Sequence, residues 1–400
     1  MPKPRIIILM HYLELGGAEM ALIGLLHALD PDKVDVDLFV YSHRGPLMQY
    51  IPDWVNLLPE VGAYSVIEEP MTVALKRGYL GVVFGRLRAK WECRRFRSKH
   101  PAKGDDGAIM QYVGDYVTPW LPRINSDVEY DLCISFLTPH NIGRDKVRAK
   151  KRLAWIHTDY STVDVDAERE LPVWDAYDNI ASISDEVTNS FLKRFPRLKS
   201  KIFPIENILP AGYVRTRSEE FDVAKEMDCD INLLSIGRYC TAKNYDNVPD
   251  IARRMLGHGM KDLKWYIIGY GGDESLIRGK IAEAGMENLV ILLGKKDNPY
   301  PYIKACDIYV QPSRYEGKSV TVREAQILCK PAVVTNYPTA QSQINDGFDG
   351  VIVPLDNEGC AQGIANFIAN KELQEQIVEN LKSGDYANES EVNKIYNFLV

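Results

Sequence analysis

The feature of this sequence that most restricts its fold is the alternation, along the whole chain, of short apolar runs with longer amphipathic segments. Short apolar runs are typical of strands buried on both faces of a parallel sheet, and the segments between them have the length of crossover helices. In 18–29, for example, Ala18, Leu22 and Leu29 fall on one helical face. We therefore predict an α/β fold with parallel sheets. The predicted strands are Arg5–Met10, Val34–Val40, Asp131–Phe136, Arg152–Ile156, Asn179–Ser182, Asn232–Ile236, Lys264–Ile268, Asn288–Leu293, Asp307–Val310, Ala332–Thr335 and Val351–Val353.

The chain is long enough for two domains. At 400 residues it exceeds one ordinary core and suits two domains of about 200 residues each. The strand–helix alternation restarts at Asn232, after two prolines and a charged stretch, so we expect the join near 203–212. Two such domains favour a ligand in the cleft between them, at the carboxyl ends of the strands. The predicted divisions are an N-terminal Rossmann-like domain at 1–207, a C-terminal Rossmann-like domain at 208–375, and a helical segment at 376–400 that packs back on the first domain.

The composition of the sequence, and the motifs that it lacks, exclude several classes of protein. Hydrophobic residues make up 46% and charged residues 26%, which is typical of a soluble globular chain. The seven cysteines include no C-x-x-C pair, which argues against a disulfide scaffold or a zinc site. No run approaches the roughly 20 apolar residues that span a bilayer, so we expect a cytoplasmic protein. The dinucleotide fingerprint and the P-loop are also missing.

Positive charge gathers in one segment, 72–103. Ten lysines and arginines and one glutamate give it nine net positive charges, although the whole chain has a net charge of -7. Aromatic and aliphatic residues lie among these cations, including Phe84, Trp91 and Phe96. This composition is typical of a helix in a membrane interface, and the alternative is a solvated helix packed on its own domain. We expect peripheral contact with the anionic inner face of a cell membrane, and no affinity for nucleic acid.

Two positions have residues suited to phosphate. Gly16 and Gly17 precede the helix predicted at 18–29, where free N–H groups favour an anion; the alternative is only a tight turn. The strand ending at Ile236 is followed by Arg238 and, on the next loop, by Lys243. A guanidinium and an ammonium at the carboxyl end of a strand suit a diphosphate. The alternative interpretation is that both residues are only solvated cations on a loop.

The segment 312–325 is the most informative one. Its loop contains Glu316, and Glu324 lies in the second turn of the helix predicted to begin near Ser319. Carboxylates accept hydrogen bonds from sugar hydroxyls, and helix-start amides suit phosphate. A pair of glutamates near a helix start is by itself uninformative. The candidate ligand-binding residues of this segment are Gly317, Lys318, Ser319, Val320 and Glu324.

His157 ends the strand predicted at 152–156, where the cleft is expected. Its imidazole is a candidate for a hydrogen bond to a sugar hydroxyl or to the acceptor, and a satisfied structural histidine is the alternative.

Together these residues resemble the retaining nucleotide-sugar glycosyltransferases of glycosyltransferase family four, which have the GT-B fold. The resemblance covers most of the chain and includes the two glutamates separated by seven residues, Glu316 and Glu324. It implies that Arg238 and Lys243 neutralise the donor diphosphate, that Glu324 binds the ribose, and that Glu316 lies over the donor sugar. The other residues that carry the resemblance are Gly16, Gly17, Ser182, Ser184, Asn207, Gly237, Gly269, Tyr270, Gly271 and 330–334.

Two segments depart from the family pattern. Gly317-Lys318-Ser319 stands where many members have Gly-Phe-Gly, and 337–343 replaces the later glycine-rich loop and its glutamate. The glutamate-glycine-lysine-serine run and 346–350 are similar to enzymes of bacterial capsule, exopolysaccharide or O-antigen synthesis. The sequence thus predicts transfer of a sugar from a nucleotide sugar, with uridine as the expected base, to a saccharide or lipid-linked acceptor.

Leaving-group stabilisation is the expected chemistry, with Arg238, Lys243, Glu316 and His157 as the candidate catalytic residues. No convincing Asp-x-Asp site is present, and the two cations could replace a metal, so we expect neither metal nor cofactor. The rival functions are a nucleotide-sugar epimerase or sugar phosphorylase of the same fold, and a non-catalytic nucleotide-sugar binding partner.

Overall fold

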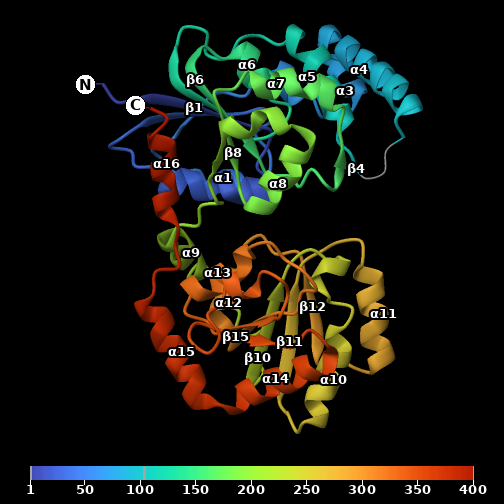
Figure 1. Ribbon diagram of the computed structural model, residues 1–400, viewed down its shortest axis with the longest axis vertical. Helices are drawn as coiled ribbons and strands as arrows, with labels where there is room; N and C mark the ends of the chain where they lie inside the picture. Colours follow the sequence, from blue (N-terminus) through green and yellow to red (C-terminus); the bar gives the residue numbers. More distant parts are fainter. Residues whose placement is uncertain (1, 102–104, 400) are drawn as a thin grey trace. The chain divides into compact units, whose positions relative to one another are not determined.

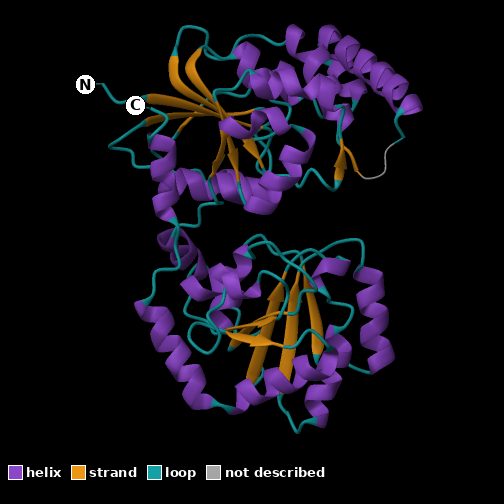
Figure 2. Cartoon of the chain, viewed as in Figure 1, coloured by secondary structure: helices purple, strands orange, loops and turns teal. Residues whose placement is uncertain are grey.

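The computed structural model describes residues 2–101 and 105–399 and divides the chain into two compact units. Unit 1 consists of the residues up to 208 together with those from 388 onward, and unit 2 consists of 209–387. The boundary expected at 207/208 lies one residue before this division. Each unit is a parallel sheet with helices on both faces (Figures 1 and 2).

The boundary expected at 375/376 is wrong. It falls inside helix α15 (Lys371–Ser383), whose Ile377 and Leu381 are buried in the core of unit 2. Because these side chains share one face of a continuous helix, the chain cannot leave unit 2 before that helix ends. Only the segment from 388 packs on unit 1, where the Tyr396 hydroxyl accepts a hydrogen bond from the Asp30 backbone N–H at 2.8 Å.

The sheet of unit 1 has the strand order β3-β2-β1-β5-β6-β8-β9, with every pair parallel. The interior strand β1 (Arg5–Met10) is an apolar run, and its residues 6–10 are at most 1% exposed, as expected for a strand covered on both faces. A separate parallel pair joins β4 to β7. The strands are β1 (Arg5–Met10), β2 (Asp35–Val40), β3 (Asn56–Leu57), β4 (Asp105–Asp106), β5 (Tyr130–Ser135), β6 (Ala149–Ile156), β7 (Val163–Asp164), β8 (Asn179–Ser182) and β9 (Ile202–Pro204).

The sheet of unit 2 has the order β12-β11-β10-β13-β14-β15, again parallel throughout. Its core joins Leu233, Trp265 and Val310 of the strands to Ile251 and Ile364 of the covering helices. The strands are β10 (Ile231–Ile236), β11 (Leu263–Ile268), β12 (Val290–Gly294), β13 (Ile308–Gln311), β14 (Ala332–Thr335) and β15 (Val351–Val353).

The helices begin and end where local signals favour it. In α8 (Asp185–Arg194) the Ser184 hydroxyl caps the N–H of Val187, acids occupy the first turn and cations the last. The other helices of unit 1 are α1 (Gly17–Ala28), α2 (Gly62–Ser65), α3 (Met71–Lys76), α4 (Leu80–Lys99), α5 (Ala108–Val117), α6 (Asn141–Lys146), α7 (Ala167–Asp175) and α16 (Asn393–Tyr396). Those of unit 2, besides α15, are α9 (Ala211–Ser218), α10 (Val248–Gly257), α11 (Glu274–Ala284), α12 (Tyr300–Ala305), α13 (Val320–Ile327) and α14 (Asn357–Ala369).

Helix α4 carries most of the basic segment and presents its large apolar residues outward. Its buried face has small or medium residues, Val82, Gly85, Ala89 and Cys93. A Cβ at Gly85 would lie 2.4 Å from the Tyr116 carbonyl oxygen, so α4 and α5 approach closely there. The opposite stripe consists of Leu80, Phe84, Leu87 and Trp91, which are 51% to 63% exposed. Lys103, at the end of the basic segment, lies outside the described residues.

Candidate functional site in unit 2

Three of the predicted site residues meet at one edge of the sheet in unit 2. Strands β10 and β13 are neighbours, and the later strands add outward on either side of them, which makes this pair the topological switch point. The loops that follow such a pair diverge and leave room for a ligand. Arg238 and Lys243 follow β10, and Glu316 follows β13, so the fold brings these three residues to the same edge.

Lys243 and Glu316 form an ion pair across that edge. Their Nζ and Oε1 atoms are 2.5 Å apart, and the side chains are 19% and 12% exposed. The same carboxylate oxygen accepts hydrogen bonds from Gln311 Nε2 at 2.9 Å and Ser313 Oγ at 2.6 Å. Three donors therefore fix the Glu316 side chain, while the Lys243 ammonium retains hydrogens for a ligand.

The side chain of Arg238 differs from that of Lys243 in its surroundings. It is exposed, and within the described part of the chain no ion pair or hydrogen bond engages its guanidinium. Its charge is therefore not compensated by a carboxylate, in contrast to that of Lys243. An uncompensated guanidinium beside a fixed ammonium suits an anion with two phosphates.

The two loops of the site are braced against each other. The Arg314 guanidinium donates to both carboxylate oxygens of Asp246 at 2.9 and 2.7 Å. The Arg314 backbone N–H donates to the Ala242 carbonyl at 2.8 Å, and Asn244 Nδ2 donates to the Pro312 carbonyl at 2.9 Å. Bidentate arginine–carboxylate pairs are directional, so these contacts fix the spacing between Lys243 and Glu316.

Close backbone packing explains the glycines at Gly269 and Gly271. A Cβ on Gly269 would lie 2.0 Å from the Gly237 carbonyl oxygen, and one on Gly271 would lie 2.3 Å from the Tyr239 carbonyl oxygen. The Tyr239 N–H also donates to the Tyr270 carbonyl at 2.8 Å. This loop therefore packs against the residues that flank Arg238, and its glycines are required for that packing.

The start of α13 is partly occupied by a side chain. The Ser319 N–H, one of the amides expected to face phosphate, donates to Gln343 Oε1 at 3.0 Å, and Gln343 Nε2 donates to the Ser319 carbonyl. Gly317 and Lys318 are exposed, as is Val320. Gln343 belongs to the segment that departs from the family pattern, so this departure leaves fewer helix-start amides available to a ligand.

Glu324 lies in α13 and is buried, with 5% of its surface exposed. Its Oε1 accepts a hydrogen bond from the Tyr300 hydroxyl at 3.0 Å. Burial raises the pKa of Glu324 to about 7, and the hydrogen bond from Tyr300 offsets part of that effect. The side chain therefore titrates close to neutral pH.

The remaining predicted residues belong to unit 1. Gly16 and Gly17 lie at the start of α1. The Glu19 carboxylate occupies the space beside Gly16, where a Cβ would lie 2.2 Å from Glu19 Oε2, whereas the space beside Gly17 is open. Burial raises the pKa of Glu19, and a bond to its own backbone lowers it. This acidic side chain competes with any anion for the helix start.

His157 follows β6, and its ring stacks on Trp155 with centroids 5.8 Å apart. Burial lowers the pKa of His157 to about 3, so the imidazole is neutral at physiological pH. Its Nε2 is buried without a hydrogen-bond partner among the described residues. A neutral imidazole can donate or accept one hydrogen bond, but it is a poor general acid.

The described residues offer no metal site. Within 2–101 and 105–399, no cluster of three or more His, Cys, Asp or Glu side chains is arranged to hold a metal ion.

Comparison with known proteins gives a family match in unit 2. Residues 216–384 match the family model described as glycosyl transferases group 1. Unit 2 is similar to the group 1 glycosyl transferases over these residues. The matched range contains Arg238, Lys243, Glu316 and Glu324, so the family inferred from those residues is confirmed for this glycosyltransferase domain.

Curated relatives align over part of their length. The N-acetylgalactosamine-N,N'-diacetylbacillosaminyl-diphospho-undecaprenol 4-alpha-N-acetylgalactosaminyltransferase of Campylobacter jejuni is 30% identical over 154 residues, which is 38% of this chain and 41% of that protein. The lipopolysaccharide core biosynthesis glycosyltransferase LpsE of Rhizobium meliloti is 24% identical over 148 residues, 37% of this chain and 42% of that protein. The chain thus matches about two fifths of the length of these relatives.

Solved glycosyltransferases share the fold over the whole chain. TarM of S. aureus, in complex with Fondaparinux, alpha-GlcNAc-glycerol and UDP, superposes with a TM-score of 0.65 at 13% identity and covers 99% of both chains. Anabaena HepE in complex with UDP and glucose gives 0.63 at 14% identity and 98% of both chains. The predicted GT-B fold is confirmed.

Sequence reasoning missed the residues that hold the candidate site together. Gln311 and Ser313 orient Glu316, and Gln343 binds the start of α13. A glutamine at the end of a buried strand is an unusual residue for an apolar core, and this signal could have identified Gln311. Gln343 lies 24 residues beyond Ser319 on an irregular loop, where no local pattern marks its contact.

We predict that Glu324→Gln flattens the pH dependence of stability. The folded pKa of Glu324 lies above its ordinary value of 4.5 at about 7, so the folded state holds the proton more tightly than the unfolded state. Stability contributed by the protonated form is present below pH 4.5 and is lost as pH rises to about 7. The difference in unfolding free energy between wild type and variant should therefore fall by about 3 kcal/mol over that window.

Urea unfolding at intervals between pH 4.5 and 7.5 measures this difference. Glu287→Gln, at an exposed position, is the control and should follow wild type. A difference between wild type and Glu324→Gln that stays constant across the window would contradict the prediction.

Proposed function

We propose that this protein is a retaining glycosyltransferase that moves a sugar from a uridine nucleotide sugar to a saccharide or lipid-linked saccharide in cell-surface glycan synthesis. The observation that carries the proposal is the Lys243–Glu316 pair beside an exposed Arg238, at the switch point of a group 1 glycosyl transferase domain. Fold alone would not decide the activity.

The proposed chemistry is stabilisation of the leaving group. As the bond between the sugar and the nucleotide breaks, negative charge grows on the diphosphate. Arg238 and Lys243 are positioned to stabilise that charge more than the ground state, because the loop that carries Lys243 is already braced. Glu316, held by Lys243, Gln311 and Ser313, would lie over the donor sugar, and Glu324 would bind the ribose. The departing phosphate would accept the proton of the acceptor on the same face.

Two relatives support the expected substrates. The Escherichia coli relative, 29% identical over 112 residues, is named a UDP-Gal:alpha-D-GlcNAc-diphosphoundecaprenol alpha-1,3-galactosyltransferase, so its donor is a uridine nucleotide sugar. The Campylobacter jejuni relative is named for an acceptor carried on undecaprenol. A uridine-linked donor and a lipid-linked acceptor follow for this chain as proposals.

The two glutamates provide the test of the assignment. Glu324→Gln should weaken binding of free UDP by about 10- to 100-fold, because a contact from a charged group to the ribose is lost. Glu316→Gln should lower kcat by about 100-fold and leave UDP affinity within about threefold, since the proposed contact is to the sugar. Calorimetric titration with UDP and a turnover assay on a panel of UDP-sugars measure both quantities. Equal effects of the two substitutions on UDP affinity would contradict the roles.

We predict that turnover does not depend on a metal ion. In the proposed mechanism Arg238 and Lys243 would supply the charge neutralisation that a divalent ion provides beside a diphosphate in other enzymes. Dialysis against EDTA should leave the rate of sugar transfer unchanged, with a metal-dependent glycosyltransferase assayed in parallel as the control. Loss of activity that magnesium or manganese restores would disprove metal independence.

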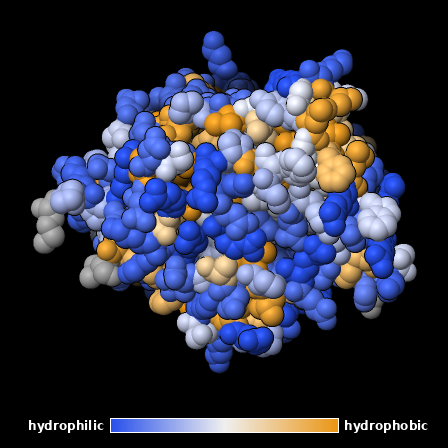
Figure 3. All heavy atoms as spheres, turned by 90° about the horizontal axis from the view of Figure 1, so that it is seen from above, coloured by the Kyte–Doolittle hydropathy of each residue, from blue (hydrophilic) through white to orange (hydrophobic). Residues whose placement is uncertain are grey.

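We also propose that unit 1 docks on the inner face of an anionic membrane through the α4 face, defined as Leu80, Phe84, Leu87 and Trp91 with the exposed cations Arg88, Lys90, Arg94 and Arg95. Large apolar residues point outward while small ones are buried, which is the reverse of a helix that only covers a core. Hydrophobic side chains gather within a hydrophilic surface on this side of unit 1 (Figure 3). Cations beside an apolar stripe suit anionic headgroups and acyl chains.

Not every cation of the basic segment is available to a membrane. Arg86 donates to the carbonyls of Val66 and Glu69, and Arg97 donates to the Asp164 carbonyl at 2.8 Å. These two arginines have structural contacts, so the α4 face omits them. No helix in the described ranges has the length and apolar character needed to cross a bilayer.

A further inference from the structure

The loop that carries Glu316 is held in place by the loop that follows β14. Residues 315–319, here called the Glu316 loop, form neither helix nor strand, so regular secondary structure does not pair their backbone groups. Two side chains of the loop at 336–343, here called the β14 loop, bind four of these groups instead. The position of the Glu316 backbone therefore depends on a segment that is distant in sequence.

Thr339 makes two of the four contacts. Its Oγ1 lies 2.8 Å from the Glu316 carbonyl oxygen and 2.9 Å from the Gly317 carbonyl oxygen. A threonine hydroxyl has one hydrogen to donate, so the two carbonyls share it and must converge on one point. This contact fixes the direction of the backbone at Glu316 and at the residue after it.

Gln343 makes the other two contacts. Its Oε1 accepts from the Ser319 N–H at 3.0 Å, and its Nε2 donates to the Ser319 carbonyl. A carboxamide carries a donor and an acceptor side by side, so it pairs with both backbone groups of one residue. Thr339 and Gln343 thus hold the Glu316 loop at its middle and at its end.

The β14 loop is itself fixed, so it can support another loop. Tyr337 and Ala340 are at most 1% exposed, and the Ala340 N–H donates to the Tyr337 carbonyl at 2.9 Å. The Asn336 N–H donates to the Val353 carbonyl at 2.8 Å, which ties the loop to β15. Close-packed side chains have little freedom to move, so the contacts from this loop set a defined position.

These contacts complement those on the Glu316 side chain. Lys243, Gln311 and Ser313 bind one carboxylate oxygen, which fixes the end of the side chain. The contacts from Thr339 fix the backbone from which that side chain extends. A catalytic group displaced by about 1 Å can lower a rate by about 100-fold, so both sets of contacts matter for turnover.

We propose that Thr339 and Gln343 are positioning residues, which hold the Glu316 loop in the conformation that presents the Glu316 carboxylate to the donor sugar. The inference rests on the proposed function, because it uses the role given there to Glu316. Neither side chain needs to touch the substrate. Loss of either one should therefore lower kcat without weakening the binding of nucleotide.

Two substitutions at Thr339 test its hydroxyl. Thr339→Val removes the hydroxyl at nearly constant volume and should lower kcat by about 10-fold, while the Kd for UDP stays within about threefold of wild type. Thr339→Ser keeps the hydroxyl and should retain kcat within about threefold. A turnover assay on a panel of UDP-sugars and calorimetric titration with UDP measure both quantities. A Thr339→Val enzyme with unchanged kcat, or with kcat and UDP affinity reduced alike, would overturn the proposal.

Gln343→Met removes both contacts to Ser319 without adding charge. It should lower kcat by about 10-fold, and UDP should bind as tightly as to wild type or more tightly, because the freed Ser319 N–H suits phosphate. Gln341→Met makes the same change at an exposed position of the same loop and should leave both quantities as in wild type. Weaker UDP binding in Gln343→Met than in Gln341→Met would indicate a direct contact with substrate and overturn the positioning role.

A double-mutant cycle with Glu316→Gln shows whether the effect passes through Glu316. In that background, Thr339→Val and Gln343→Met should each lower kcat by less than about twofold further, because the group that they position is already lost. Full and independent effects in the Glu316→Gln background would give both residues another role and overturn the proposal.

Hydrogen exchange measured by mass spectrometry reports on the Glu316 loop without any assay of activity. The peptide that contains Ser319 should exchange faster in Thr339→Val and in Gln343→Met than in wild type. Unchanged exchange in both variants would also overturn the proposal.

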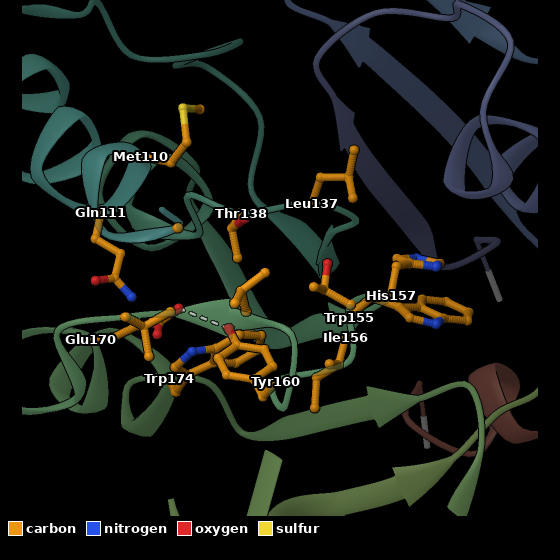
Figure 4. A pocket seen from close by; sticks show the side chains of 14 residues that line it. Met110, Gln111, Leu137, Thr138, Trp155, Ile156, His157, Tyr160, Glu170 and Trp174 are labelled. Carbon is orange, nitrogen blue, oxygen red and sulfur yellow. Dashed lines mark hydrogen bonds between the residues drawn. The ribbon is translucent and has the colours of Figure 1, made fainter. Parts of the chain in front are cut away.

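Tyr160→Phe is the control for a general loss of stability. Tyr160 and Glu170 lie in the wall of a cavity in unit 1 beside His157 (Figure 4), where the Tyr160 hydroxyl donates to Glu170 Oε1 at 2.9 Å. Removal of that hydroxyl should lower the unfolding midpoint and leave the exchange of the Ser319 peptide unchanged. Faster exchange of this peptide in Tyr160→Phe would mean that the exchange reports only on global stability, which would overturn the proposal.

The wild-type protein separates this inference from the proposed function. Sugar transfer and UDP binding by wild type that persist unchanged in Thr339→Val and Gln343→Met would overturn the inference and leave the proposed function intact. Absence of both activities from wild type would overturn the proposed function, and with it the role of Glu316 on which the inference rests.

Discussion

Replacing Arg238 with alanine is expected to lower kcat/KM by about 30- to 1000-fold, corresponding to about 2–4 kcal/mol of lost transition-state stabilisation. The reason is that its guanidinium would meet the charge that develops on the diphosphate. Because the side chain is exposed and, in the described chain, engaged by neither ion pair nor hydrogen bond, its removal should leave the unfolding midpoint nearly unchanged. A large kinetic effect without a stability effect is the signature of a group that acts on substrate.

The controls for this prediction use other cations of unit 2. Arg278→Ala removes an exposed arginine that forms an ion pair with Glu274 four residues earlier in α11, and it should leave kcat/KM unchanged. Arg238→Lys keeps the charge without the planar donors and should fall between wild type and Arg238→Ala. Lys243→Met should lower both kcat/KM and stability, because it leaves the nearly buried Glu316 without its cation. An Arg238→Ala enzyme within threefold of wild type would refute the role of this arginine.

Neutralising the α4 face is expected to reduce binding to anionic vesicles by about 1000-fold at low salt. The variant changes Arg88, Lys90, Arg94 and Arg95 together to glutamine, which preserves helix propensity. Each cation near an anionic surface contributes about 1 kcal/mol, so four of them contribute about 4 kcal/mol. Co-sedimentation with vesicles that contain or lack anionic lipid measures the partition coefficient.

Two further measurements separate the electrostatic part of membrane binding from the hydrophobic part: binding at high salt, and binding of a second variant. The Debye length falls from about 10 Å at 0.1 M salt to about 3 Å at 1 M, so binding of wild type should weaken steeply. Insertion of Phe84 and Trp91 does not depend on charge, and binding should persist weakly at high salt unless both are replaced by serine.

The matched control changes four exposed cations of unit 2, Arg215, Lys225, Lys261 and Lys371, to glutamine. This variant has the same net charge as the neutralised α4 variant and should bind vesicles like wild type. Membrane docking through the α4 face would be excluded if wild type failed to bind anionic vesicles at low salt, or if the α4 variant bound them equally well.

Local apolar patterning was sufficient to locate the sheets. Every predicted strand overlaps an observed one, and Arg5–Met10, Asn179–Ser182, Ala332–Thr335 and Val351–Val353 have the predicted bounds. The strands that were not predicted, β3, β4, β7 and β9, are two or three residues long, too short for a periodic signal. The order of the strands could not be predicted, because it depends on contacts between segments far apart in the chain.

The sequence by itself determined the residue types that carry the proposed chemistry. Arg238, Lys243, Glu316 and Glu324 stand at strand ends and at a helix start, and parallel architecture directs strand ends to one edge of a sheet. Their spacing also identified the family that the comparison confirms for unit 2. These conclusions depend on short-range order along the chain, which the sequence records directly.

Tertiary structure alone decided how those residues are held and what surrounds them. Lys243 and Glu316 are 73 residues apart in sequence and form an ion pair only because β10 and β13 are adjacent. Gln343 contacts the start of α13 through packing of segments that no local pattern connects. The physical reason is that hydrogen bonding, burial and the resulting pKa values depend on neighbours in space, and the neighbours of a folded chain are set by its topology.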